Sequence, residues 1–135
     1  MLSRRDNPDK SPSSAPRIAV DRRELGDHTS IISIEGELDL STAPQLKWAL
    51  VDATQAGRDQ LIVDLSKATF MDSTALGVLI GVNRGLAAGE RLAIVCVAPT
   101  ILRVFELSGM DGAFAIYETV EEALDDGAGS AAETG

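Results

Sequence analysis

Short β-rich runs alternate with segments of helical periodicity along residues 17–126, and this alternation is the strongest constraint on the fold. In the first half we expect a strand starting at Ile18, a strand Ile31–Leu38, a helix capped by Ser41 or Thr42 with Gly57 as its stop signal, a strand Leu61–Leu65 and a loop Ser66–Asp72. In the second half we expect a helix from about Ser73 to Ala88, a strand Leu92–Val97, a helix that begins at Pro99 and has Gly109 after it, a strand Ala113–Tyr117 and a closing helix Val120–Asp126. Gly26-Asp27 separates the first two strands, which predicts a hairpin. The pattern predicts an α/β fold: one domain with a small mixed β-sheet, an N-terminal hairpin and parallel central strands.

The two ends of the chain differ in composition from the segment between them. Residues 1–16 and 127–135 are rich in small and polar residues and show no hydrophobic period, so we expect a flexible leader over 1–16, a folded domain over 17–126 and a disordered tail over 127–135. The start of the chain has charges but no apolar core region, which is unlike a signal peptide. The longest apolar run, Ala75–Val82, is far shorter than the roughly 20 residues that span a bilayer. We expect a cytoplasmic protein with no membrane insertion.

Composition excludes several kinds of chemistry. The chain has 21 acidic and 12 basic residues, a net charge of −9, and an acidic surface repels phosphate backbones, so we expect no direct nucleic-acid binding. One cysteine and one histidine cannot form an internal disulfide or a zinc site built from these two residue types. Cys96 lies in an apolar run, which is typical of a buried hydrophobic residue, and His28 lies in a predicted turn. These counts disfavour a metal enzyme. We expect a protein that is not an enzyme and has no cofactor or metal.

The junction before the second predicted helix carries three consecutive helix-capping residues, Asp72, Ser73 and Thr74. Capping is their common role. A hydroxyl at a helix start is also a favourable phosphorylation point, because the backbone N–H groups there are partly unpaired and the helix dipole is positive. A phosphate adds about −1.5 to −2 charges at neutral pH, which a docking partner would have to desolvate beside Asp72. The junction is therefore a candidate switch.

The helix that follows is apolar on nearly every side, and three glycines recur on it every four residues: Gly77, Gly81 and Gly85. Each glycine costs about 1 kcal/mol of helix propensity, and a glycine stripe lets another backbone approach closely. Close packing against the domain's own sheet is one explanation of the stripe. A partner-binding face around the start of the helix is the other.

Several segments, taken together in chain order, resemble a known family. They are Gly36-Glu37-Leu38-Asp39, Val63-Asp64-Leu65-Ser66, Phe70-Met71-Asp72-Ser73, Leu76-Gly77-Val78 with Gly81, and Val104-Phe105-Glu106-Leu107-Ser108-Gly109-Met110. In this order, over roughly residues 17–125, the chain resembles the STAS domain of bacterial anti-sigma factor antagonists. The resemblance implies a small mixed sheet with helices mainly on one face.

The resemblance also implies a function. Ser73 matches the family's serine that is phosphorylated by an anti-sigma factor, itself a protein serine kinase. The unphosphorylated antagonist binds the anti-sigma factor and releases a sigma factor, phosphorylation blocks this binding, and a phosphoserine phosphatase restores it. Asp39 matches an acidic residue near the phosphoacceptor, and an Asx turn over Asp39–Thr42 is its other interpretation. The expected docking surface consists of Asp39, Asp72, Ser73, Thr74, Ala75, Leu76 and Gly77.

Some features leave alternatives open. Many members have Ser-Gly where this chain has Thr74-Ala75, so the hydroxyl of Thr74 is a second candidate acceptor. Trp48 points away from the apolar stripe of its helix, either as a contact residue or as a cover for the hairpin or a tail. Other functions of such a domain are an accessory subunit of a membrane transporter or stress-signalling assembly, and a nucleotide-binding regulatory protein.

Overall fold

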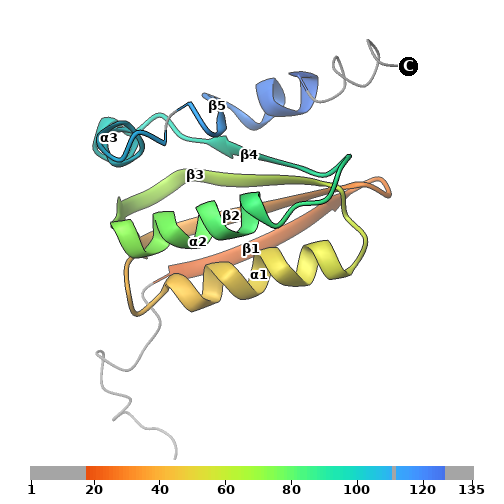
Figure 1. Cartoon of the computed structure of the whole chain (residues 1–135), viewed down its shortest axis with the longest axis horizontal. Coiled ribbons are helices and arrows are strands. Elements are labelled where there is room, and N and C mark those ends of the chain that lie inside the picture. The colour runs from red at the N-terminus through yellow and green to blue at the C-terminus, as the bar shows by residue number, and fades with distance from the viewer. Residues whose placement is uncertain (1–17, 111, 127–135) are drawn as a thin grey trace, which may run out of the picture.

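The computed structural model describes residues 18–110 and 112–126, and its centre is a five-stranded sheet in the order β1-β2-β3-β4-β5 (Figure 1). The strands are β1 (Ile18–Leu25), β2 (Thr29–Leu38), β3 (Gln60–Met71), β4 (Arg91–Val95) and β5 (Ala115–Tyr117). β1 and β2 pair antiparallel, and every later pair is parallel. The predicted mixed sheet with an N-terminal hairpin is confirmed. The predicted leader over 1–16 and the predicted tail over 127–135 lie outside the described residues.

Three helices cover one face of this sheet. They are α1 (Ala43–Gln55), α2 (Ser73–Arg84) and α3 (Pro99–Leu107), and each contributes buried residues to the main hydrophobic core. The closing helix, residues 120–126, lies on the other face, where Ala123 packs with Ile62 and Val95. The prediction that the helices lie mainly on one face of the sheet is therefore confirmed. None of the described helices is long and apolar enough to cross a membrane.

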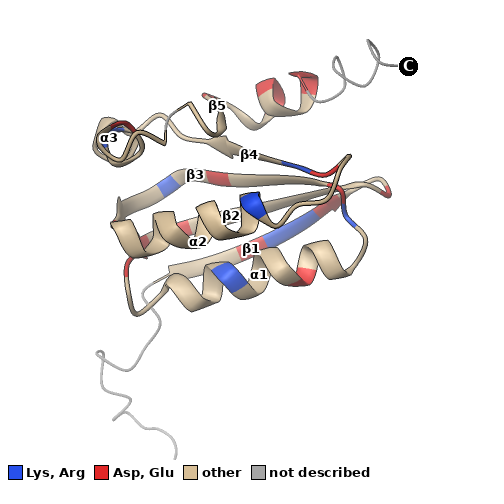
Figure 2. Ribbon diagram, viewed as in Figure 1, with Lys and Arg blue, Asp and Glu red and all other residues tan. Residues whose placement is uncertain are grey.

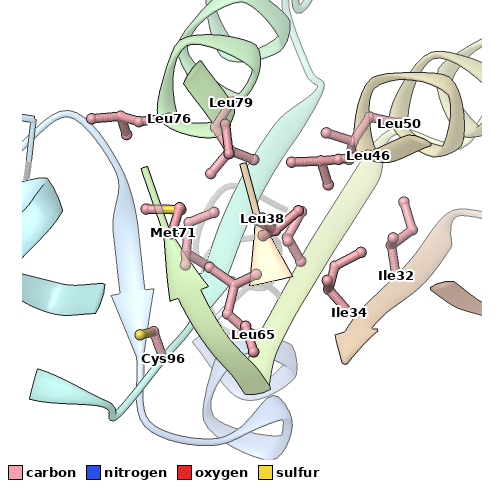
Figure 3. Packing of buried hydrophobic residues seen from close by; sticks show 14 of the residues in the cluster. Ile32, Ile34, Leu38, Leu46, Leu50, Leu65, Met71, Leu76, Leu79 and Cys96 are labelled. Atoms are coloured by element: carbon pink, nitrogen blue, oxygen red, sulfur yellow. The ribbon is translucent and has the colours of Figure 1, made fainter. Parts of the chain in front are cut away.

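The main core lies between α1, α2 and the central strands (Figure 3). Leu46 and Leu50 of α1 and Leu79 of α2 are fully buried against side chains of β2 and β3. Strand alternation sends Ile32 to this core and Ile31 to the smaller core under the closing helix. Burial of each such side chain contributes about 1.5–3 kcal/mol to stability. These contacts hold α1 and α2 against the sheet.

β3 is longer than the predicted strand Leu61–Leu65, and the predicted loop Ser66–Asp72 is wrong. The strand continues to Met71 and stays paired with β2, with two register shifts, one between Ser33 and Glu35 and one between Gly36 and Glu37 of β2. At each shift β3 carries an extra residue, and a bulge of this kind interrupts the alternation by which a strand is recognised. Gly36, beside the second shift, has φ 113°, a conformation that favours glycine.

α2 ends at Arg84, so its predicted extension to Ala88 is wrong. The N–H of Gly85 donates to the carbonyls of Gly81 and Val82, both at 3.1 Å, and the chain then turns. In that turn the carboxylate of Glu90 accepts the N–H of Ala87 at 2.6 Å. Gly77 and Gly81 lower the propensity of the helix, and this local turn at Gly85 competes with a further helical turn. The predicted start of α3 at Pro99 and the closing helix over 120–126 are confirmed.

Candidate functional site

The ends of β2 and β3 bring two carboxylates to the same edge of the sheet. Pairing of β3 with β4 ends at Asp64 and Val95, whereas its pairing with β2 continues to Leu38 and Met71. The N–H of Asp72 donates to the carbonyl of Leu38 at 3.0 Å. Because Asp39 follows Leu38 directly, it lies beside the segment that carries Asp72 and Ser73, in the neighbourhood that the resemblance implied.

Asp72 is the N-cap of α2. Its carboxylate oxygen Oδ1 accepts the N–H of Thr74 at 2.9 Å and the N–H of Ala75 at 3.1 Å, and its carbonyl accepts the N–H of Leu76 at 3.2 Å. The sequence led us to expect N–H groups free to hold a phosphate at this helix start. Two of those donors are instead occupied by Asp72, because an aspartate side chain at the N-cap reaches them without strain. An anion on Ser73 would compete with a carboxylate already in place.

Ser73 is the first residue of α2, and it is exposed. Its hydroxyl has no hydrogen-bond partner among the residues that the structure describes. Thr74 is exposed as well. Both candidate acceptors are therefore open to an enzyme, and the helix below them is fixed by its buried side rather than by either hydroxyl.

Asp39 organises the turn that leads into α1. Its Oδ1 accepts the N–H and the hydroxyl of Ser41, at 3.0 and 2.8 Å, and the N–H of Thr42 at 3.2 Å. The hydroxyl of Thr42 donates to the carbonyl of Glu37 at 2.7 Å and accepts the N–H of Asp39 at 2.9 Å. The predicted Asx turn over Asp39–Thr42 is confirmed. Thr42 occupies the predicted N-cap position, but its side chain makes no capping bond, since its hydroxyl is used within the turn.

Ala75 and Leu76 belong to the core and not to the surface. They are 0% and 3% exposed, so they have no area to offer to a docking protein, and their place on the predicted docking surface is corrected. They follow the exposed Ser73 and Thr74 because the helix turns by about 100° per residue, which brings these two positions round to the sheet. Gly77 is exposed and stays on the surface.

A groove of about 570 Å³ runs between α1 and α2. Thr74, Gly77, Val78, Gly81 and Val82 line it from α2, Gly85 lines it directly after that helix, and Lys47, Val51 and Thr54 line it from α1. A Cβ atom added at Gly77 or Gly81 would meet no atom within 4 Å. The glycine stripe therefore faces this groove, and its predicted packing against the domain's own sheet is wrong at these two positions. The sequence did not reveal that α1 supplies the second wall.

Three large apolar side chains lie exposed on the described surface near these elements: Leu40 and Trp48 at 73% and Phe70 at 48%. Trp48 points outward as predicted, and its exposure shows that the hairpin does not cover it. Leu40 lies in the turn that Asp39 organises, and Phe70 lies at the end of β3. Leu40 was missed from the sequence; an apolar residue within an otherwise polar turn was the available signal.

Charge is sparse on α2 itself, whose single charged residue is Arg84 at its end (Figure 2). The charged residues nearest the start of this helix are therefore Asp72, which precedes it in the chain, and Asp39, which follows the strand residue paired with Met71. Cys96, the residue directly after β4, is buried, and burial raises the pKa of its thiol, which fits the predicted hydrophobic role. Among the described residues no group of three or more His, Cys, Asp or Glu side chains is placed to hold a metal.

Comparisons with known proteins agree on one family. Residues 19–123 match the family model of the STAS domain. The anti-sigma-B factor antagonist of Staphylococcus epidermidis is 33% identical over 91 residues, which cover 67% of this chain and 84% of that relative. An anti-sigma factor antagonist from Mycobacterium paratuberculosis has a similar structure, with a TM-score of 0.77, 29% identity and coverage of 83% of this chain and 96% of that one. The Bacillus cell fate determinant SpoIIAA in its phosphorylated form is similar with a TM-score of 0.64, 30% identity and coverage of 80% and 98%.

Proposed function

Because the chain belongs to the STAS domain family, we propose that it is an anti-sigma factor antagonist switched by phosphorylation of Ser73. In its unmodified form it binds an anti-sigma factor with serine kinase activity and so releases a sigma factor. The docking surface that we propose comprises Asp39, Asp72, Ser73, Thr74 and Gly77, with Ala75 and Leu76 as buried support. The protein acts by binding and not by catalysis.

The observation that carries this proposal is the state of the Ser73 hydroxyl. Ser73 is exposed at the first position of α2, directly after the N-cap Asp72, and its hydroxyl makes no hydrogen bond within the described residues. A kinase can therefore transfer a phosphoryl group to it without breaking any internal contact. In that step the Ser73 oxygen forms a bond to the γ-phosphorus of ATP, the bond from that phosphorus to the β–γ bridging oxygen breaks, ADP leaves and the hydroxyl proton is released.

The reverse step needs a phosphoserine phosphatase. Water attacks the phosphorus, the bond from phosphorus to the Ser73 oxygen breaks, inorganic phosphate leaves and the serine hydroxyl is regained. The phosphorylated form of the similar protein SpoIIAA supports a phosphorylation step in this chain. Ser73, as an exposed hydroxyl directly after the N-cap, is the acceptor we propose, and Thr74 is the second choice.

Electrostatics explain how one phosphate turns binding off. The carboxylate of Asp72 already accepts the N–H groups of Thr74 and Ala75, so a phosphate on Ser73 adds charge without gaining these two donors. When a partner docks, this added charge of about −1.5 to −2 must leave water next to a carboxylate. A penalty of about 3 kcal/mol weakens binding by on the order of a hundredfold.

The groove between α1 and α2 extends the proposed docking surface beyond the phosphorylation site. Thr74 lies on its wall, next to Ser73 in the chain, and the open side of Gly77 and Gly81 faces into it. Because these glycines lower helix propensity without making room for any part of the described domain, we propose that the partner approaches closely there.

The decisive experiment compares wild type with Ser73→Ala, Ser73→Asp and the control Thr74→Ala. Each is immobilised and exposed to lysate of the source bacterium, and captured proteins are identified by mass spectrometry. We expect wild type, Ser73→Ala and Thr74→Ala to retain a small serine-kinase-like anti-sigma factor and Ser73→Asp to lose it. The purified partner with ATP should then place phosphate on Ser73 and not on Thr74.

Two results would contradict the proposal. Equal binding of Ser73→Asp and wild type removes the switch, and phosphate on Thr74 alone moves it to the neighbouring residue. Capture of a permease or another assembly component in place of a serine kinase would instead identify an accessory subunit. Calorimetric titration with GTP and ATP tests nucleotide binding separately.

A further inference from the structure

β1 is the edge strand of the sheet, and its eight residues pair along their whole length with β2. No strand among the described residues pairs with its other side. An open edge presents a row of backbone N–H and C=O groups and is a template for pairing with another chain. Edge strands usually carry charged residues that prevent such pairing, and β1 carries four of them in a row: Asp21, Arg22, Arg23 and Glu24.

These four charges fall on two faces. Arg22 points to the helix side, where its guanidinium bonds to Glu24 and to Asp52 of α1, each at 2.5 Å, so its charge is neutralised inside the domain. Asp21 and Arg23 point to the opposite, open face, where both line a shallow polar hollow. Neither takes part in an ion pair with another described residue. The open face of β1 thus carries one negative charge, on Asp21, and one positive charge, on Arg23, that can form ion pairs with another chain.

We propose that β1 pairs antiparallel with β1 of a second copy of this chain, about a two-fold axis at Arg22. In this register Asp21 of each copy lies directly opposite Arg23 of the other, which gives two ion pairs on the open face. Opposite charges directly across two strands stabilise their pairing, and like charges oppose it. The two Arg22 side chains that meet at the axis are each already neutralised by Glu24 and Asp52.

The neighbouring registers fit less well. A two-fold axis at Asp21 places two carboxylates opposite each other, and an axis at Arg23 places two guanidinium groups opposite each other, neither of which is held in an ion pair by a described residue. An unrelated strand carries a basic residue opposite Asp21 and an acidic residue opposite Arg23 only by coincidence. The charge pattern therefore favours a second copy in one register over other strand edges. A single strand-to-strand junction is smaller than a standard interface, so we expect a dimer that forms only at about micromolar concentrations or above.

The test is sedimentation equilibrium of the full chain from about 1 µM to about 1 mM at physiological salt, the range in which small interfaces associate. We expect wild type to form a dimer whose dissociation constant rises at least about tenfold in Asp21→Arg and in Arg23→Asp, the loss of roughly 1.4 kcal/mol. The double variant Asp21→Arg/Arg23→Asp restores opposite charges across the axis and should restore the dimer. Glu106→Arg, an equal charge change on the exposed side of α3, is the matched control and should leave the dimer unchanged.

Circular dichroism confirms that each variant is folded. A wild-type chain that stays monomeric at 1 mM overturns the proposal, and so does a dimer that the two single variants leave intact. A double variant that fails to dimerise while folded overturns the register. None of the residues changed here belongs to the proposed docking surface, so failure of this proposal leaves the Ser73 switch untouched.

Discussion

The starts of α1 and α2 have related sequences and opposite chemical states. Each follows one of two paired parallel strands, and each has an aspartate shortly before two hydroxyl residues: Asp39 before Ser41 and Thr42, and Asp72 before Ser73 and Thr74. At α1 the hydroxyls of Ser41 and Thr42 are bound within the turn, and Thr42 is 2% exposed. At α2 the Ser73 hydroxyl is exposed and unbound among the described residues.

The difference arises from where each strand ends. β2 stops at Leu38 and leaves four residues before α1, enough for a turn that closes on itself. β3 runs to Met71 and leaves only Asp72, so that aspartate must cap the helix and the next hydroxyl is left outside. The same pattern of an aspartate followed by hydroxyl residues therefore has two outcomes. Where the strand ends early, the hydroxyls are used in a turn, and where the strand runs up to the helix, the hydroxyl stays available for modification. The following substitutions test this contrast on one scale, the free energy of unfolding.

Thr42→Val should have the largest effect, a loss of about 2 kcal/mol of stability, because it leaves the carbonyl of Glu37 and the N–H of Asp39 without their buried hydroxyl partner. Urea denaturation followed by circular dichroism measures it. Thr42→Ser, which keeps the hydroxyl, is the control and should recover most of the loss. A loss below about 0.5 kcal/mol, the usual size of a surface change, would mean that the turn does not depend on this hydroxyl.

Asp72→Ala should cost about 1 kcal/mol, since it removes the side-chain acceptor of the Thr74 and Ala75 N–H groups. Asp72→Asn keeps an acceptor at the N-cap and should stay close to wild type in the same denaturation experiment. If both variants lose equal stability, the charge of Asp72 and not its capping bond is what stabilises α2.

Gly81→Ala should raise stability by about 0.5–1 kcal/mol, because the added Cβ meets no atom and alanine is the better helix former. Thermal and urea unfolding both measure the gain. Gly36→Ala is the contrasting control: at φ 113° a side chain is strained, so stability should fall. A loss of stability in Gly81→Ala would show that the stripe is packed against something within the chain.

Ser73→Ala should have the smallest effect, within about 0.5 kcal/mol of wild type, as for a surface residue without partners. Its comparison with Thr42→Val, measured under identical conditions, is the sharpest form of the contrast between the two helix starts. Equal losses in the two variants would place the Ser73 hydroxyl inside the folded structure's hydrogen-bond network and remove the basis for the proposed switch.

The sequence by itself determined the fold class, the hairpin at the edge, the parallel centre and the position of α2 directly after Asp72. These features follow from local patterns: the alternation of apolar residues in a strand, their helical spacing and the capping preference of aspartate. It also identified the segment that carries the candidate site, because the motif residues that resemble the family lie on it.

Only the tertiary structure decided how far β3 runs, which hydroxyls are occupied and which side of α2 is open. The bulges in β3 depend on its register with β2, and a bulge disrupts the alternation that sequence reasoning relies on. Thr42 is engaged because Glu37 and Asp39 come close to it in the turn, and the glycine stripe is open because α1 packs beside α2 and leaves a groove between them. Exposure and hydrogen-bond occupancy depend on neighbours distant along the chain, so a local pattern cannot specify them.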